Sequence, residues 1–146
     1  MKQISENIAA IRARMKKAGA GDHVNLVAVS KMQPAGRVRA ALEAGHRLFG
    51  ENKVQEAKER WPALKQEYPD VRLHFIGHLQ TNKVKEAVAL FDVIETVDSA
   101  KLAAALADEM KKQGRNLPCF IQVNTGEEAQ KGGIIPSDLP ALLDQC

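Results

Sequence analysis

The feature that most constrains the fold is an alternation of short apolar runs with longer segments of helical periodicity. The runs begin at Asn25, Leu48, Leu73, Val93 and Cys119. They follow one another at intervals of roughly 20 to 26 residues, close to the minimum for a crossover between parallel strands. Parallel strands joined by right-handed helical crossovers form an open doubly wound sheet or a (β/α) barrel. The sequence therefore predicts an α/β fold with a parallel sheet.

The segments between the runs carry apolar residues at the spacing of three and four that marks one face of a helix. The stripe after the second run consists of Val54, Ala57, Trp61 and Leu64. Glycines follow several of these segments, and Gly45 and Gly114 are well placed to end helices. An amphipathic helix is also expected before the first strand. The pattern indicates helices that cover the predicted sheet.

The number of strand and helix units favours an incomplete barrel. A TIM-type barrel has eight βα units, and three more units of about 24 residues would bring the chain to roughly 220 residues. We therefore expect residues 1–146 to form a single barrel domain with about five of the eight units, truncated on its C-terminal side. The two edge strands of such a barrel would be uncovered. They predict self-association, in which another copy covers the open barrel edges.

Composition excludes several classes of partner. The chain has 21 basic and 18 acidic residues spread along its length, which gives no extended basic field for nucleic acid. There is no signal peptide and no apolar run near 18 residues, so no membrane partner is expected. Two cysteines in such a chain favour a reducing, cytoplasmic setting, and their spacing offers no metal site.

Polar side chains follow each of the five predicted strands. They are Ser30 and Lys31, Glu51 and Asn52, His78, Asp98 and Ser99, and Asn124 and Thr125. In a barrel, the carboxyl ends of the strands form the mouth of the ligand site. Helix capping is the competing interpretation for Asn52, Thr81, Asp98 and Ser99, because their side chains can accept hydrogen bonds from the first turn of a helix.

Lys31 is the strongest candidate for chemistry. It ends the first apolar run, Asn25–Lys31, which is predicted to be a strand buried on both faces. Lysine has no acceptor for a helix N-terminus, and its charge opposes the helix dipole there. A desolvated lysine at a strand end can attack a carbonyl and form a Schiff base. The residues alone leave the choice open between an aldolase and a pyridoxal 5'-phosphate (PLP) protein.

Four motifs of the chain are Val27-Ala28-Val29-Ser30-Lys31, Phe49-Gly50-Glu51-Asn52 followed by Val54-Gln55-Glu56, the segment 74–83, and Gln122-Val123-Asn124 with Lys131 and Gly133. In order and spacing they resemble the motifs of the PLP homeostasis protein family, whose fold is similar to the N-terminal barrel of alanine racemase. The resemblance implies that PLP is held as a Schiff base on Lys31 with Asn52 near the cofactor. It also implies that His78 and Lys131 lie around the mouth of the barrel.

The same resemblance implies a role in intracellular PLP homeostasis without substrate turnover, so that the protein is not an enzyme. PLP-dependent apoenzymes are then the implied recipients of the cofactor, and the family's phosphate-binding segment would lie beyond Cys146. Two alternatives remain. An amino-acid racemase needs acids and bases on both faces of its substrate, and the chain has one tyrosine, Tyr68, in a predicted turn. A truncated interaction module that binds no cofactor is the other.

Overall fold

The structure, a computed structural model, describes residues 2–146. In chain order the elements are α1 (Lys2–Lys17), β1 (Ala28–Val29), α2 (Ala35–Glu43), β2 (Leu48–Glu51), α3 (Val54–Glu67), β3 (Arg72–Phe75), η1 (Thr81–Lys83), α4 (Val84–Leu90), β4 (Val93–Val97), α5 (Ala100–Gln113), β5 (Cys119–Ile121), η2 (Pro136–Asp138) and α6 (Leu139–Leu143). Within these residues, no helix is both long and apolar enough to cross a membrane.

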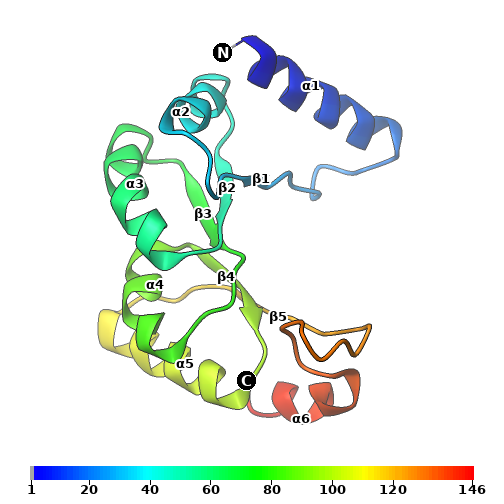
Figure 1. The fold of residues 1–146 in the computed structure, drawn as a ribbon, viewed down its shortest axis with the longest axis vertical. Coiled ribbons are helices and arrows are strands. Elements are labelled where there is room, and N and C mark those ends of the chain that lie inside the picture. The colour runs from blue at the N-terminus through cyan, green and yellow to red at the C-terminus, as the bar shows by residue number, and fades with distance from the viewer. Residues whose placement is uncertain (1) are drawn as a thin grey trace.

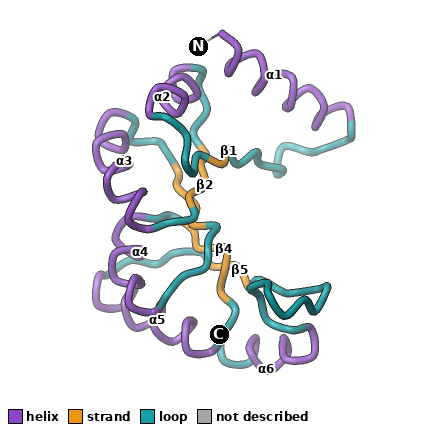
Figure 2. The backbone as a smooth tube through the Cα atoms, viewed as in Figure 1, coloured by secondary structure: helices purple, strands orange, loops and turns teal. Residues whose placement is uncertain are grey.

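The five strands form one parallel sheet in the order β1-β2-β3-β4-β5. Helices α2 to α5 lie along the convex side of this sheet, and the molecule curves around an open concave side (Figures 1 and 2). The predicted α/β architecture is confirmed as an incomplete α/β barrel. Because the five strands are parallel, their carboxyl ends lie on the same side of the sheet, which we call the carboxyl edge. The loops that follow the strands there form the candidate site.

The core lies between the sheet and the helices. Successive strand side chains alternate between the two faces, and those on the convex face pack against α3 and α4. Phe49 packs on Trp61 and Phe75 on Phe91, with 5.0 Å between ring centroids in each pair. All four rings are buried, and burial of each such side chain contributes about 1.5–3 kcal/mol. This layer fixes the orientation of β2 and β3.

Two helix ends are as predicted. The Oγ of Ser99 accepts a hydrogen bond from the N–H of Leu102 at 3.2 Å and caps α5. Gly114 ends the same helix in the left-handed conformation, with φ +62°, which glycine adopts without a steric penalty. Ser99 is therefore a structural residue, as the capping interpretation had it.

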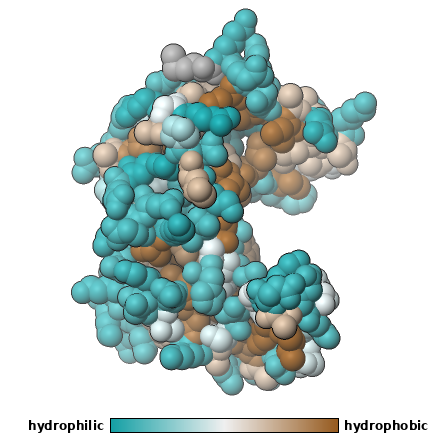
Figure 3. Space-filling view, in the orientation of Figure 1, coloured by the Kyte–Doolittle hydropathy of each residue, from teal (hydrophilic) through white to brown (hydrophobic). Residues whose placement is uncertain are grey.

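The first strand differs from its prediction. Only Ala28 and Val29 pair as a strand, and Val29 is 51% exposed, so the run 25–31 is not buried on both faces. The reason is topological, because β1 is an edge strand that pairs with β2 alone. One face of it borders the open concave side of the molecule, along which apolar residues reach the surface in Figure 3.

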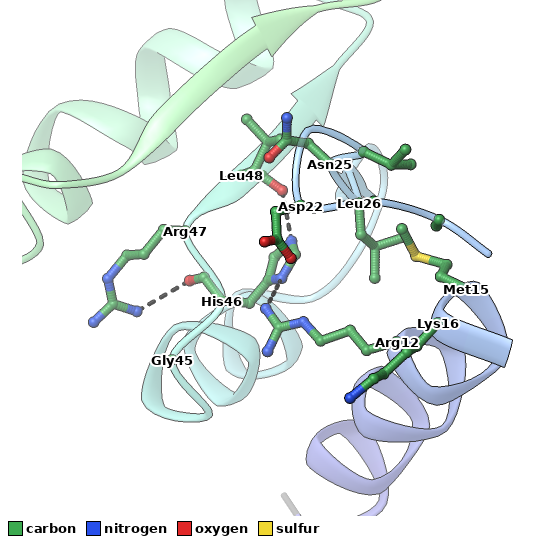
Figure 4. A pocket seen from close by; sticks show the side chains of 13 residues that line it. Arg12, Met15, Lys16, Asp22, Asn25, Leu26, Gly45, His46, Arg47 and Leu48 are labelled. Carbon is green, nitrogen blue, oxygen red and sulfur yellow. Dashed lines mark hydrogen bonds between the residues drawn. The ribbon is translucent and has the colours of Figure 1, made fainter.

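His46 joins α1 to the sheet. It lies beside a cavity of about 510 Å³ at the amino ends of β1 and β2, the edge opposite Lys31 (Figure 4). Its Nε2 donates to the carbonyl of Leu48 at 2.7 Å, and its Nδ1 accepts from the guanidinium of Arg12 at 3.1 Å. Burial lowers the pKa of His46 below its ordinary value of 6.5, and the charges of Arg12 and Arg47 act in the same direction. The folded protein therefore holds a neutral imidazole here.

This arrangement predicts a loss of stability in mild acid. Below pH 6.5 the unfolded chain protonates His46 more readily than the folded chain does, so the free energy of unfolding falls as the pH falls through 6.5 toward the lower folded pKa. In a His46→Gln variant this contribution is absent, and we expect a flatter pH dependence between pH 7.5 and 5.5 in urea unfolding. His23→Gln, at an exposed position, is the control. Equal slopes for the wild type and the His46 variant would contradict the assignment.

Candidate functional site

Lys31 and Asn52 follow neighbouring strands at the carboxyl edge of the sheet. The register pairs Val29 with Gly50, and the N–H of Ser30 donates to the carbonyl of Gly50 at 3.0 Å. Lys31 comes directly after Ser30, and its side chain is exposed. Asn52 comes directly after β2, at the corresponding level of the next strand. Lys31 and Asn52, which the family resemblance implies lie at the cofactor, therefore lie on adjacent loops at the carboxyl ends of the strands.

Lys31 sits in a tight turn that pattern reasoning missed. The N–H of Gln33 donates to the carbonyl of Ser30 at 3.1 Å, which closes the turn around Lys31 and Met32. Met32 has φ +57°, in the left-handed region that residues other than glycine rarely occupy. Met32 is 80% exposed, so its side chain makes little packing contact with the rest of the protein. Such a backbone conformation costs on the order of 1 kcal/mol or more and persists only where surrounding contacts hold it.

Glu51 does not lie in the mouth of the barrel, contrary to its prediction among the polar strand ends. Its side chain is fully buried on the convex face, which it shares with Phe49. Its Oε1 accepts from the Oγ of Ser30 at 2.8 Å, and from the side-chain nitrogens of Arg60 and Trp61 at 3.0 Å each. The alternation of side chains along β2 could have indicated this position. Glu51 lies two residues after the buried Phe49, and residues two apart in a strand lie on the same face.

Asn52 carries an unsatisfied polar atom. Its Oδ1 is buried and has no hydrogen-bond partner within the described residues, whereas buried polar atoms are ordinarily paired. It does not cap α3, whose N-cap position is Lys53 without a side-chain hydrogen bond. A polar ligand at this edge could supply the missing partner. This is the feature of the site that most directly indicates a ligand.

Gly77 fixes the position of Asn52. A Cβ at Gly77 would lie 2.1 Å from the carbonyl oxygen of Asn52, so only glycine permits the observed approach of the two backbones. The Oγ1 of Thr96 donates to the carbonyl of Gly77 at 2.6 Å and ties the same turn to β4. His78 follows in this turn, and its side chain is exposed. His78 is thus one strand further along the edge than Asn52.

Lys131 lies in the loop after β5, at the far end of the row of strands. Asn124 organises this loop through hydrogen bonds with the backbone of Glu128, one in each direction. The ammonium group of Lys131 pairs with the carboxylate of Glu128 at 2.7 Å. Residues of this loop, between Gln122 and Gly132, line a cavity of about 290 Å³ that includes Lys131 and not Lys31. Lys31, Asn52 and His78 follow consecutive strands, and Lys131 stands apart from them.

Asp98 also departs from the capping interpretation. Its Oδ2 accepts from the backbone N–H of Gly133 at 3.1 Å, so it binds the far side of the loop that carries Lys131. Gly133 has φ +108°, a conformation suited to glycine, and a Cβ there would lie 2.7 Å from the backbone nitrogen of Asn124. Asp98 and Gly133 therefore help to hold the loop above β5 in place.

The chain matches the model of the family described as "Alanine racemase, N-terminal domain" over residues 1–146. It is 38% identical to a protein of Vibrio cholerae and 41% identical to one of Pseudomonas aeruginosa, each over 99% of this chain and 64% of the relative. A relative from Bos taurus is 37% identical, over 99% of this chain and 55% of its own length. All three are named "Pyridoxal phosphate homeostasis protein". The chain thus spans 55–64% of these relatives.

Solved structures agree with this result. PipY of Synechococcus elongatus without PLP superposes with a TM-score of 0.88 at 40% identity, over 97% of this chain and 63% of PipY. PipY with PLP bound gives a TM-score of 0.83 at 39% identity over the same shares. An alanine racemase of Clostridium difficile gives a TM-score of 0.66 at 14% identity, over 86% of this chain and 33% of the racemase, and shares the fold alone.

Proposed function

Because the chain belongs to the alanine racemase N-terminal domain family, we propose that it binds PLP at Lys31 and takes part in intracellular PLP homeostasis without turning over a substrate. The observation that carries the proposal is the buried, unpartnered Oδ1 of Asn52 on the loop beside Lys31. The names of the relatives and the PLP bound to PipY support the same ligand.

The residues at the carboxyl edge fit this cofactor. When bound, PLP supplies an aldehyde that condenses with a primary amine and releases water. Lys31 presents its amine at the strand end where such chemistry is expected, although within residues 1–146 the side chain is exposed and not desolvated as expected from the sequence. Asn52 offers a side-chain amide that lacks a partner and can orient a polar ring substituent. These two residues are proposed to hold the reactive end of the cofactor.

His78 and Lys131 have supporting roles in the proposal. His78 lies on the turn next to Asn52 and can donate or accept a hydrogen bond at the mouth. The charge of Lys131 is already balanced by Glu128, so we expect a weaker contribution from it than from Lys31. The dianionic phosphate also needs backbone or cationic donors. We propose that residues 1–146 are the N-terminal part of a barrel domain whose remaining units provide them.

The position of the single tyrosine, Tyr68, supports the proposed lack of turnover. Racemisation needs proton donors and acceptors on both faces of the substrate. Tyr68 is the sole tyrosine in the 146 residues, and it follows α3 at the amino edge of the sheet, away from Lys31. There the guanidinium of Arg47 lies over its ring, 5.1 Å from the centroid. This position supports a carrier of PLP over a racemase.

A carrier needs recipients, and we propose that PLP-dependent apoenzymes of the cytoplasm receive the cofactor. The proposed recipients depend on the proposed PLP binding. Independently of it, for residues 1–146 without the remaining barrel units, we propose self-association through the two edge strands of the sheet, β1 and β5.

Binding of two vitamers tests the proposal. Pyridoxine 5'-phosphate has the ring and the phosphate of PLP but carries an alcohol in place of the aldehyde, so it cannot condense with Lys31. We expect equilibrium dialysis to give at least tenfold tighter binding of PLP, which corresponds to about 1.4 kcal/mol. Lys53→Ala should leave this ratio unchanged, because Lys53 pairs with Glu56 on the neighbouring helix. Equal affinity for the two compounds would contradict a covalent role for Lys31.

A further inference from the structure

Arg60 reaches from α3 to both ends of the turn that carries Lys31. Its Nη1 donates to the carbonyl of Ser30 at 3.0 Å, and its Nη2 donates to the carbonyl of Gln33 at 2.8 Å. These carbonyls flank Lys31 and Met32. One side chain thus bridges the two ends of a four-residue turn from the outside, which a planar guanidinium with several fixed donors can do.

The guanidinium is itself held in place. Its Nη1 also donates to the Oε1 of Glu51 at 3.0 Å, and the Glu51 side chain is fully buried. The indole of Trp61 and the hydroxyl of Ser30 donate to the same oxygen. Hydrogen bonds between charged groups are strong, and partial burial strengthens them further. Arg60 is therefore a rigid link between the core and the turn.

The turn needs such a link. Met32 adopts φ +57°, and a turn with this conformation would relax if nothing outside it held its two carbonyls. Met32 itself is largely exposed and contributes little packing to hold the turn. The contacts to Arg60, together with the hydrogen bond from the N–H of Gln33 to the carbonyl of Ser30, account for its geometry.

We propose that Arg60 is a positioning residue for Lys31, and that it sets where the lysine leaves the sheet edge. This inference rests on the proposed function of Lys31 in PLP binding. Arg60 acts through the backbone of the turn, on the convex side, and its guanidinium donates hydrogen bonds to Ser30, Gln33 and Glu51. Loss of Arg60 should loosen the turn and lower the reactivity of Lys31 toward the cofactor. It also removes the cation that pairs with the buried Glu51 carboxylate, so the overall stability of each variant is measured beside these effects.

Amide hydrogen exchange tests the structural half of the proposal without any cofactor. In an Arg60→Met variant we expect the amide of Gln33 to exchange about tenfold faster or more, because its hydrogen bond to Ser30 is no longer held from outside. Arg60→Lys can reach one carbonyl but not both, so a smaller increase is expected. Arg39→Met is the matched control, since Arg39 pairs with Glu67 at the surface and should leave Gln33 unchanged.

Borohydride trapping of PLP tests the functional half. We expect the yield of pyridoxyl-Lys31 at limiting PLP to fall about tenfold in Arg60→Met, to fall less in Arg60→Lys, and to stay at the wild-type level in Arg39→Met. If Arg60→Met does not fold, the Arg60→Lys variant decides the question. A folded Arg60 variant with wild-type exchange at Gln33 and wild-type trapping would overturn the proposal.

The exchange and trapping experiments together distinguish failure of the Arg60 proposal from failure of the proposed function. Absence of pyridoxyl-Lys31 in the wild type would count against PLP binding at Lys31 and hence against the role of Arg60 in it. Faster exchange of Gln33 in Arg60→Met, with wild-type exchange at the core amides of β3, would still establish that Arg60 holds the turn. Unchanged exchange alongside normal labelling of wild-type Lys31 would contradict only the role of Arg60.

Discussion

Replacement of Lys31 by alanine is expected to abolish reducible attachment of PLP at the site. Incorporation after borohydride reduction should fall from about one pyridoxyl group per chain to the background level of surface lysines, because alanine offers no amine to the aldehyde. The substitution should cost little stability, since the side chain is exposed and lies outside the core. Intact-mass measurement at limiting PLP gives the stoichiometry, and urea unfolding checks the fold.

Lys53→Ala is the matched control for this prediction. Lys53 also follows a strand at the carboxyl edge, it is exposed, and its ammonium group pairs with Glu56 at 3.2 Å. The control should therefore incorporate as much pyridoxyl as the wild type. If the Lys31 variant retained the wild-type stoichiometry while Lys53→Ala lost it, the assignment of the reactive amine would be wrong.

Replacement of Gly77 by alanine is expected to give the largest loss of stability among conservative changes at the site. The added Cβ would lie 2.1 Å from the carbonyl oxygen of Asn52, a backbone atom that cannot rotate away. Forcing an extra carbon into a packed region costs about 1–3 kcal/mol, and a backbone clash this close falls at or above the upper end. The free energy of unfolding in urea measures the effect. PLP binding should weaken as well, because Asn52 must shift.

Gly36→Ala is the control, and its expected effect has the opposite sign. Gly36 lies in the first turn of α2, and an added Cβ there would meet nothing within 4 Å. Alanine in a helix is favoured over glycine by about 0.5–1 kcal/mol, so this variant should be slightly more stable than the wild type. A Gly77 variant as stable as the wild type would show that the two backbones do not need their close approach.

The fold could be predicted from periodicity because helix stripes and strand runs record which faces are buried. Val54, Ala57, Trp61 and Leu64 were expected on one face of a helix, and all four are buried. The run predicted to begin at Val93 starts at the first residue of β4. Strands that alternate with helices along the chain are compatible with few topologies, because each pair of parallel strands must be joined by a right-handed crossover. The extent of burial of the edge strand was not predictable, because it depends on what lies across the concave side.

The site was harder to predict, because residue type does not say which way a strand-end side chain points. Asn52, Asp98 and Ser99 are equally competent caps, yet Ser99 caps its helix while Asp98 binds Gly133 and Asn52 keeps a free oxygen. Glu51 was expected at the mouth and instead lies in the core with Arg60. Long-range pairings such as Arg60 with the Lys31 turn span 27 to 30 residues and leave no local pattern.

The most direct test of the central claim is a peptide map of the wild-type protein after incubation with limiting PLP and reduction with borohydride. We expect the pyridoxyl group on the peptide that contains Lys31, at a stoichiometry of about one per chain. Labels spread over the surface lysines, with Lys31 unmodified, would contradict the proposal that this lysine holds the cofactor.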